Sequence, residues 1–162
     1  MAVWLVRAGA KGEHEQKFLA DSRIYLTKKL NIDVSHLSER SELIELMTEV
    51  YAGDKPRKVS NLASQVWLFA HVMQVEDWVV LPSKFETVVY VGKIKADYHY
   101  DGSAEHPYYH WRIVDWQPMS IERSKLPQQL QRSLSAAMTI CQLKNDDAIE
   151  SLQQVLSVNS VN

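Results

Sequence analysis

The chain has few of the residues that cross-link or interrupt a fold. Its 162 residues include one cysteine, Cys141, with five glycines and five prolines. A single cysteine cannot form a disulfide within the chain, and so little glycine and proline excludes collagen-like and low-complexity structures. The fold must therefore be held by an apolar core. A chain of this length can build one, since domains of about 150 residues bury about two thirds of their unfolded surface.

Long apolar runs and targeting features are also missing. No segment approaches the roughly 20 apolar residues that span a bilayer. The start of the chain, Met1–Trp4, lacks the basic region and the long apolar stretch of a signal peptide. We therefore expect no membrane association and a location in the reducing cytoplasm.

The chain has no excess of charge of one sign. Lys and Arg total 18 against 20 Asp and Glu, which gives a net charge of -2 at pH 7. Such a chain has no overall positive field to attract nucleic acid, so any phosphate binding must come from a local patch. With 46% hydrophobic and 23% charged residues, the composition is that of an ordinary globular domain.

Apolar β-favouring runs and amphipathic stripes alternate along the sequence, and they predict strands and helices respectively. We expect strands over Val3–Val6, Arg23–Thr27, Trp78–Leu81, Thr87–Ile94 and Arg112–Trp116, and helices over Glu13–Ala20, from Ser38 to Tyr51, from Ser60 to Met73 and from Ser124 to Met138. Residues 139–143 form either a closing strand or a packed extension. The order of elements predicts an α+β fold over residues 1–145, a mixed β half-barrel flanked by helices, with a helix or tail over residues 146–162.

The motifs of common catalytic and metal sites are absent from the sequence. It has no G-x-S-x-G elbow, Walker A loop, C-x-x-C pair or H-E-x-x-H helix, so acyl transfer, nucleotide hydrolysis and structural zinc lack their usual residues. Glu105, His106 and His110 could hold a metal, but a solvated loop is favoured because no further ligand follows at an ordered spacing. Cys141 lies in an apolar run, where burial makes a thiol less reactive, so packing is the simpler role. We expect no catalytic residue, no metal and no cofactor.

Aromatic and polar side chains occur together in a pattern suited to a nucleobase. Rings stack on a planar base, while amides, hydroxyls and main-chain groups bond to its edge. The residues concerned are Gln65, Trp67, Ser83, Lys84, Tyr98 and Tyr100. The rings have a structural alternative: Trp67 lies at the edge of a buried helical stripe, where packing is favoured, and the two tyrosines could simply cover a sheet edge.

Basic residues that could contact phosphate lie in the polar connections. They are Lys28, Lys29, Lys55, Arg57 and Lys58. Positive side chains around one pocket mouth would offset the neutral overall charge, although ordinary solvated loops have the same composition.

Five blocks of the sequence resemble, in order and spacing, the amino-terminal domain found ahead of Mrr-type restriction endonuclease domains. The blocks are Trp4–Gly9, Ser60–Asn61 with Gln65–Phe69, Asp77–Lys84, Val91–Ile94 leading to Tyr98–Tyr100, and Thr139–Leu143. The pattern is more distantly similar to the EVE and YTH domains of the PUA-like superfamily, in which an opening strand, a polar helix and later strands enclose a pocket for a modified base. The resemblance covers nearly the whole chain and implies a PUA-like, EVE-like half-barrel.

This resemblance implies a non-catalytic reader that flips a methylated or otherwise modified base of DNA into an aromatic pocket and directs a fused or partner nuclease. Carried over by position, Arg7 and Ala8 would contact the base edge, one wall would run from Tyr25 to Lys28, and Tyr98 with Tyr100 would form the opposite wall. The other base-binding residues would be Asn61, Gln65, Trp67, Ser83 and Lys84. The phosphate contacts would be Lys29, Lys55, Arg57 and Lys58. Relatives often carry an aromatic residue near Lys28, and Glu76 stands where a glycine is usual. An RNA-binding PUA-like module and an enzyme acting on a small ligand are the alternatives that remain open.

Overall fold

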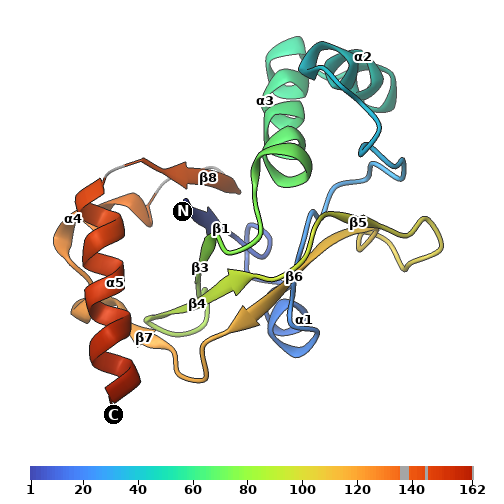
Figure 1. Cartoon of the computed structure of the whole chain (residues 1–162). Helices are drawn as coiled ribbons and strands as arrows, with labels where there is room; N and C mark the ends of the chain where they lie inside the picture. Colours follow the sequence, from blue (N-terminus) through green and yellow to red (C-terminus); the bar gives the residue numbers. More distant parts are fainter. Residues whose placement is uncertain (136–138, 145, 162) are drawn as a thin grey trace.

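The computed structural model describes residues 1–135, 139–144 and 146–161, without the side chains of residue 148 and residues 158–161. The strands within these ranges are β1 (Val3–Val6), β2 (Arg23–Tyr25), β3 (Trp78–Pro82), β4 (Val88–Ile94), β5 (His99–Tyr100), β6 (His110–Trp116), β7 (Ile121–Glu122) and β8 (Ile140–Leu143). The α-helices are α1 (Glu15–Ala20), α2 (Arg40–Val50), α3 (Pro56–Trp67), α4 (Gln128–Ser133) and α5 (Asp146–Val161), with a π-helical turn η1 over Leu68–Val72 and a 3-10 turn η2 over Arg123–Lys125. Figure 1 shows their arrangement.

The strands form one curled mixed sheet, a half-barrel flanked by helices. The strand order is β2-β6-β4-β3-β1-β8, while β5 extends β6 and β7 extends β4. β1 runs parallel to β3, and the other pairings are antiparallel. The predicted α+β half-barrel is therefore confirmed, and residues 139–143 contain the closing strand β8 rather than a packed extension.

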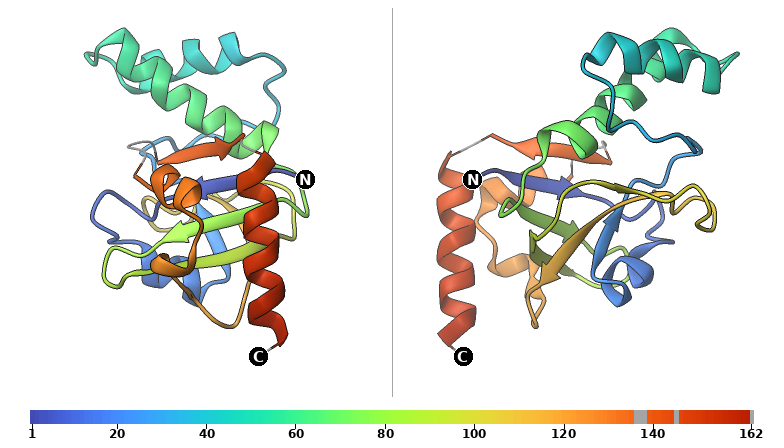
Figure 2. Two further views of the ribbon diagram at one scale, coloured as in Figure 1. Left: turned by 90° about the vertical axis from the view of Figure 1, so that its left-hand side faces the viewer. Right: turned by 45° about the vertical axis from the view of Figure 1, so that its right-hand side comes forward.

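The sheet is buried on both faces along β1 and β3 and most of β4, which explains why these central strands are continuous apolar runs. Along β1, Trp4 and Val6 belong to a core shared with α1, α2 and α3, whereas Val3 and Leu5 belong to a second core shared with α4 and α5. Alternate side chains of a strand point to opposite faces, so every second residue faces each core. Figure 2 shows the two helical groups on opposite sides of the sheet.

The buried carboxylate of Asp77 joins the start of β1 to the turn before β3. Its Oδ1 accepts the backbone N–H of Ala2 at 3.0 Å, and its Oδ2 accepts the indole N–H of Trp4 at 3.0 Å and the backbone N–H of Gln74 at 2.9 Å. The N–H of Trp78 then donates to the carbonyl oxygen of Ala2 at 2.9 Å. These bonds place Val3 opposite Trp78 and so set the parallel register of the two strands.

Helix starts differ from the sequence prediction. α3 begins at Pro56 rather than after Ser60, because proline at the first helical position has no N–H to leave unpaired. α2 is preceded by Glu39, and the hydroxyl of Ser38 instead donates to the carboxylate of Glu42 at 2.9 Å. The predicted starts of these two helices were therefore wrong.

The last predicted helix also starts later than expected. Ser124 lies within the turn η2, and α4 begins after Pro127. Ala137 and Met138, which were expected to continue its apolar stripe, lie outside the described residues. The described part of the chain has no helix that is both long and apolar enough to cross a membrane.

Replacing Asp77 should weaken the whole fold. An Asp77→Ala variant leaves the indole N–H of Trp4 and two backbone N–H groups without their acceptor, and we expect a loss of about 3 kcal/mol in the free energy of unfolding, the upper value for a hydrogen bond to a charged group. Urea unfolding followed by tryptophan fluorescence measures this. Asp115→Ala, which removes an exposed carboxylate from β6, should change the free energy by less than about 0.5 kcal/mol. Equal effects of the two substitutions would contradict the role given to Asp77.

Candidate functional site

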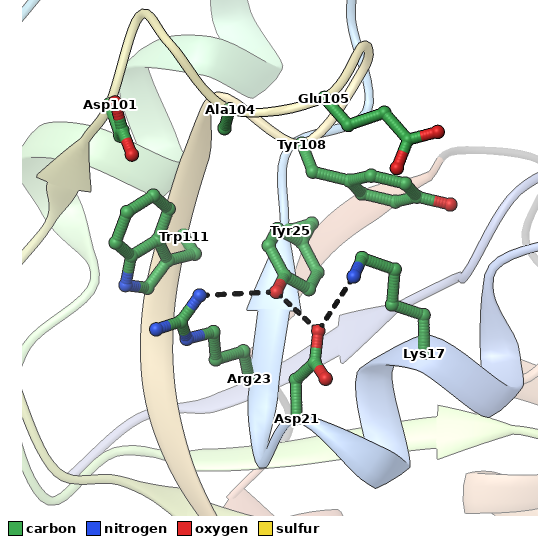
Figure 3. A pocket seen from close by; sticks show the side chains of 9 residues that line it. All are labelled: Lys17, Asp21, Arg23, Tyr25, Asp101, Ala104, Glu105, Tyr108 and Trp111. Atoms are coloured by element: carbon green, nitrogen blue, oxygen red, sulfur yellow. Dashed lines mark hydrogen bonds and ion pairs between the residues drawn. The ribbon is translucent and has the colours of Figure 1, made fainter.

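A ring-lined hollow of about 300 Å³ opens between α1, β2, β6 and the β5–β6 connection (Figure 3). We call it the aromatic hollow. Its lining residues are Lys17, Asp21, Arg23, Tyr25, Asp101, Ala104, Glu105, Tyr108 and Trp111. A volume of this size is at the lower end of the range for small-molecule sites, so it suits a single flat ring system rather than an extended ligand.

The floor of the aromatic hollow is the ring of Tyr25. This side chain is 4% exposed, and its ring centroid lies 5.0 Å from that of Tyr108 and 6.4 Å from that of Trp111. In Figure 3 the Tyr25 ring lies between the other two. Two β-strands and a connecting loop therefore bring three rings to one surface depression.

A chain of hydrogen bonds fixes the polar side of the aromatic hollow. The Tyr25 hydroxyl donates to Oδ2 of Asp21 at 2.6 Å and accepts from the Arg23 guanidinium at 3.2 Å. Lys17 forms an ion pair with the same Asp21 oxygen at 3.0 Å. The hydrogen bonds from Tyr25 and Lys17 lower the pKa of Asp21, while burial and the bond to Asp21 raise the pKa of Tyr25. Asp21 is therefore held ionised, and Tyr25 stays protonated.

Two cations already lie against the rings. The Arg23 guanidinium carbon is 4.3 Å from the centroid of Trp111, and the Lys17 ammonium is 4.8 Å from the centroid of Tyr108. The ring of His99 also stacks on Trp111, at 5.9 Å and 7° between planes. The Arg23 guanidinium thus covers part of the Trp111 ring and can itself stack on a nucleobase, as aromatic rings do.

A second hollow, of about 390 Å³, lies where β1 and β3 end; we call it the basic hollow. Its lining residues are Arg7, Gly9, Ala10, Lys84, Arg123, Leu134, Ser135 and Thr139. The parallel pairing of β1 with β3 brings Arg7 and Lys84 to the same edge of the sheet. Two residues of the predicted base-binding set thus line one hollow, together with Arg123, which was not predicted.

Tyr98 and Tyr100, the expected second wall, both contact His110. The Tyr98 hydroxyl is 2.6 Å from Nδ1 of His110 and its ring stacks on the imidazole at 5.7 Å, while the Tyr100 centroid is 5.3 Å from the same ring. Tyr98 also packs edge-on against Phe69, and the Tyr100 hydroxyl bonds to Oδ1 of Asn31 at 2.8 Å. Both rings therefore pack against His110, and neither lines the aromatic or the basic hollow.

The two expected aromatic walls point to opposite faces of the β2–β6–β5 ribbon. Tyr25 is paired with Trp111 in the register of β6, whereas Tyr100 is paired with His110, the residue before it. Because neighbouring residues of a strand face opposite sides, Tyr25 and Tyr100 do not face each other across one hollow. The structure instead places Tyr25 opposite Tyr108.

Other predicted base-binding residues make internal contacts. The ring of Trp67 stacks on His71 at 4.1 Å and 18°. The Ser83 hydroxyl accepts the N–H groups of Phe85 and Glu86 at 3.1 and 3.2 Å, which closes the turn after β3. Ala8 is buried and its carbonyl oxygen accepts the N–H of His14 at 3.0 Å.

Three further predicted residues line neither hollow. Asn61 is exposed on α3, and Gln65 of the same helix is buried with an Oε1 that meets no hydrogen-bond donor in the described structure. Lys28 is half-buried, and burial lowers its pKa.

The basic residues expected to contact phosphate line neither the aromatic nor the basic hollow. Lys55, Arg57 and Lys58 are exposed at the start of α3, where Lys58 pairs with Asp54 at 3.6 Å. Lys29 lies over the ring of Tyr51 at 4.5 Å. The structure thus places these four residues around the α2–α3 connection.

The residues that sequence reasoning missed are Lys17, Asp21, Arg23, Tyr108, Trp111 and Arg123. The alternation of β6 could have indicated Trp111, since that strand buries His110, Arg112 and Val114 and turns the intervening residues outward. Arg23 and Tyr25 are two apart on a strand and hence on one face. No local sequence pattern could have identified Arg123 as a site residue, because its position beside the hollow depends on residues far away in the sequence.

The candidate metal and thiol residues form no site in the described structure. Within the described ranges no group of three or more His, Cys, Asp or Glu side chains is placed to hold a metal. Cys141 is half-buried on β8, and burial raises the pKa of its thiol. A raised pKa leaves the sulfur protonated at neutral pH and therefore weakly nucleophilic.

Buried His110 should make stability depend on pH. Burial lowers its pKa below 6.5, so the ring is neutral at pH 7. Its Nε2 must then donate to the carbonyl oxygen of Leu30 at 2.7 Å, which leaves Nδ1 to accept from the Tyr98 hydroxyl at 2.6 Å. A lowered histidine pKa means that the unfolded chain binds the proton first, so stability is full above pH 6.5 and falls as the pH drops below it. We expect His110→Gln to lose less of its own free energy of unfolding between pH 7 and pH 5, in urea titrations, than the wild type. His106→Gln, in the exposed loop, should follow the wild-type pH profile; identical profiles for all three proteins would refute this assignment.

Comparison with known proteins identifies a family but no named relative. No curated protein and no solved structure matches the chain. A family model described as a domain of unknown function, DUF8426, matches residues 4–144. This match includes every strand of the half-barrel from the second residue of β1 through β8. The chain therefore belongs to the DUF8426 family.

Proposed function

We propose that this protein is a non-catalytic reader of a modified nucleobase in DNA, with a PUA-like, EVE-like half-barrel that receives the flipped base in the aromatic hollow. In this role it would direct a fused or partner nuclease. The observation that carries the proposal is the convergence of Tyr25, Tyr108 and Trp111, with the guanidinium plane of Arg23, on one open depression. Flat polar heterocycles are the ligands that such a surface suits.

The rim of the aromatic hollow supplies groups for reading a base edge. Lys17 and Arg23 are hydrogen-bond donors, while the exposed carboxylates of Asp101 and Glu105 are acceptors. Exocyclic amino groups of adenine and cytosine donate, and their ring nitrogens accept, so both kinds of partner are present. The acceptors favour a base that carries an amino or methylamino group.

The strand arrangement supports the PUA-like assignment. The opening strand β1 lies beside β3, which follows the turn at Asp77, and β8 closes the sheet on the other side of β1. This is the order of blocks on which the resemblance to modified-base readers rests. The hollow lies at the end of the sheet formed by β2, β5 and β6.

The energetics favour moderate affinity. Extruding a base costs a few kcal/mol, and each good stacking contact returns about 1–3 kcal/mol. A methyl group adds only about 0.8 kcal/mol of apolar burial, so discrimination must also come from the fit of the base edge. Two stacking surfaces plus edge hydrogen bonds are enough to make the exchange favourable.

Trp111→Ala should weaken binding to modified duplex DNA about 5- to 150-fold, the factor that corresponds to loss of 1–3 kcal/mol of stacking. Fluorescence anisotropy with labelled duplexes containing methyladenine, methylcytosine, hydroxymethylcytosine or no modification measures this. Phe85→Ala is the matched control, because Phe85 is an exposed aromatic side chain, 72% accessible, outside the hollow. It should bind as the wild type does.

Two outcomes would reject this proposal. One is equal affinity for modified and unmodified duplexes with no effect of Trp111→Ala. The other is loss of binding in Trp67→Ala with Trp111→Ala unaffected, which would move the base away from the aromatic hollow. A single-stranded RNA of the same sequence serves as competitor, and its preference over every duplex would assign the protein to RNA-binding modules instead.

A further inference from the structure

The basic hollow collects positive charge in a chain whose net charge is negative. Arg7 comes from the end of β1, Lys84 from the turn after β3, and Arg123 from the turn η2. No carboxylate is among its lining residues, and residues 136–138, which lie outside the described structure, carry no charge in the sequence. Three cations from three separate segments therefore border one space of about 390 Å³.

Backbone contacts hold these segments in place. The N–H of Arg7 donates to Thr139 at 2.8 Å, and its guanidinium donates to the carbonyl oxygen of Leu134. The N–H of Arg123 donates to Thr87 at 2.9 Å. The N–H of Lys84 donates to the buried carboxylate of Glu15 at 3.1 Å. The fold thus sets the backbone positions of all three residues, and the Arg7 guanidinium is held by Leu134 as well.

Both arginines border this hollow, and no acid is among its lining residues. Burial and, to a smaller extent, the charge of Arg123 lower the pKa of Arg7. The Nε of Arg123 is buried and has no hydrogen-bond partner in the described structure. A buried donor without an acceptor costs free energy, and a bound oxyanion would supply that acceptor.

The carboxylates nearest in sequence to the Gly9–Gly12 loop, Glu13 and Glu15, accept hydrogen bonds from backbone N–H groups. The carboxylate of Glu13 lies against Gly9 and accepts the N–H of Lys11 at 3.3 Å, while Glu15 accepts from Lys84. Gly9 and Gly12 have φ of +89° and +73°, so this loop adopts left-handed backbone that brings it close to the turn after β3. The loop thus closes one side of the basic hollow without placing a carboxylate in it.

We infer that the basic hollow is a phosphate site in which Arg7, Lys84 and Arg123 bind the oxygens of one phosphate group. Arginine pairs with phosphate through paired N–H groups, and lysine adds a point charge. The phosphate could belong to a nucleic-acid backbone or to a free phosphate ester. This site is separate from the aromatic hollow and does not depend on base recognition there.

Inorganic phosphate tests the site directly. We expect it to bind the wild-type protein in the millimolar range by isothermal titration, in a buffer whose ionic strength is held constant with chloride. Lys84→Gln and Arg123→Gln should each weaken this binding about tenfold or more, the lower value for a lost hydrogen bond to a charged group. Lys125→Gln is the matched control, since Lys125 is exposed on the same turn as Arg123 but does not line the hollow.

Oligonucleotides identify the source of the phosphate. If the protein binds a duplex through its backbone, the logarithm of the binding constant falls linearly with the logarithm of the salt concentration. In Lys84→Gln and in Arg123→Gln this slope should be less steep by about 0.9, the value for one lost phosphate contact. A preference for an oligonucleotide with a terminal phosphate over the same strand without it would assign the site to a phosphate monoester. Lys84 is exposed, so its variant should fold even if the Arg123 variant does not; thermal melting checks both.

The inference is overturned if phosphate gives no binding heat with the wild type, or if both variants bind phosphate as Lys125→Gln does. Neither result bears on the aromatic hollow, because inorganic phosphate has no base. Conversely, Trp111→Ala should leave phosphate binding unchanged even where it abolishes recognition of modified DNA.

Discussion

The pairing of β1 with β3 depends on one buried carboxylate. Asp77 accepts hydrogen bonds from the start of β1 and from the turn before β3, and it does so with an exposed fraction of 5%. A charge so little exposed is stable only because several N–H groups surround it. Since side chains alternate along a strand, a different register would turn Trp4 out of its core. Both cores and the basic hollow are built on this register.

The same register explains why two distant segments share a hollow. Leu5 lies opposite Val80, so two residues further along Arg7 comes opposite Pro82, the last residue of β3, and Lys84 follows two residues later. Parallel strands place their carboxyl ends at one edge of the sheet, which is where open α/β sheets commonly bind ligands. The turn η2 adds Arg123 to this edge because β7 pairs with the start of β4. The basic hollow thus follows from strand pairing and not from a sequence motif.

Strand β6 divides the aromatic residues into two groups. His110 and Arg112 turn inward, where Arg112 donates to the carbonyl oxygen of Phe69 at 2.8 Å and His110 joins Leu30 to Tyr98. Trp111 turns outward to the aromatic hollow. The tyrosines of the β5 region therefore pack on the side of β6 that bears His110, and the rings of the aromatic hollow lie on the other side.

The sequence alone predicted the elements with strong local patterns. The apolar runs of β1, β3, β4 and β6 and the stripe of α2 were recognised, and so was the α+β half-barrel. Strand β5 was not, because two residues in an aromatic loop have no period to detect; they are ordered by pairing with β6. The π-helical turn after α3 was also missed, because a distant residue contributes to it: the guanidinium of Arg112 in β6 donates to its carbonyl oxygens.

The candidate sites were predictable only in part, for a related reason. Arg7, Tyr25 and Lys84 were identified from the resemblance to modified-base readers, carried over by position. Their partners Tyr108 and Arg123 could not be, because they lie more than 80 residues from Tyr25 and more than 30 from Lys84 respectively, and local patterns contain no information on such contacts. The opposite orientation of Tyr25 and Tyr100 likewise follows from the register of β6, which the sequence does not reveal.

A short series of hydrogen bonds connects the aromatic hollow to the basic hollow. Tyr108 of the aromatic hollow bonds to Nδ1 of His14 at 2.7 Å, and the N–H of His14 donates to Ala8, the neighbour of Arg7 in the basic hollow. The first hollow combines rings with groups of both charge signs, and the second has cations alone. A nucleotide has the same division, with a flat polar base joined by a sugar to an anionic phosphate. A free phosphate ion would use only the basic hollow, whereas a nucleotide strand could use both. Local charge at one sheet edge would then be sufficient for binding by a chain whose net charge is -2, without an overall positive field.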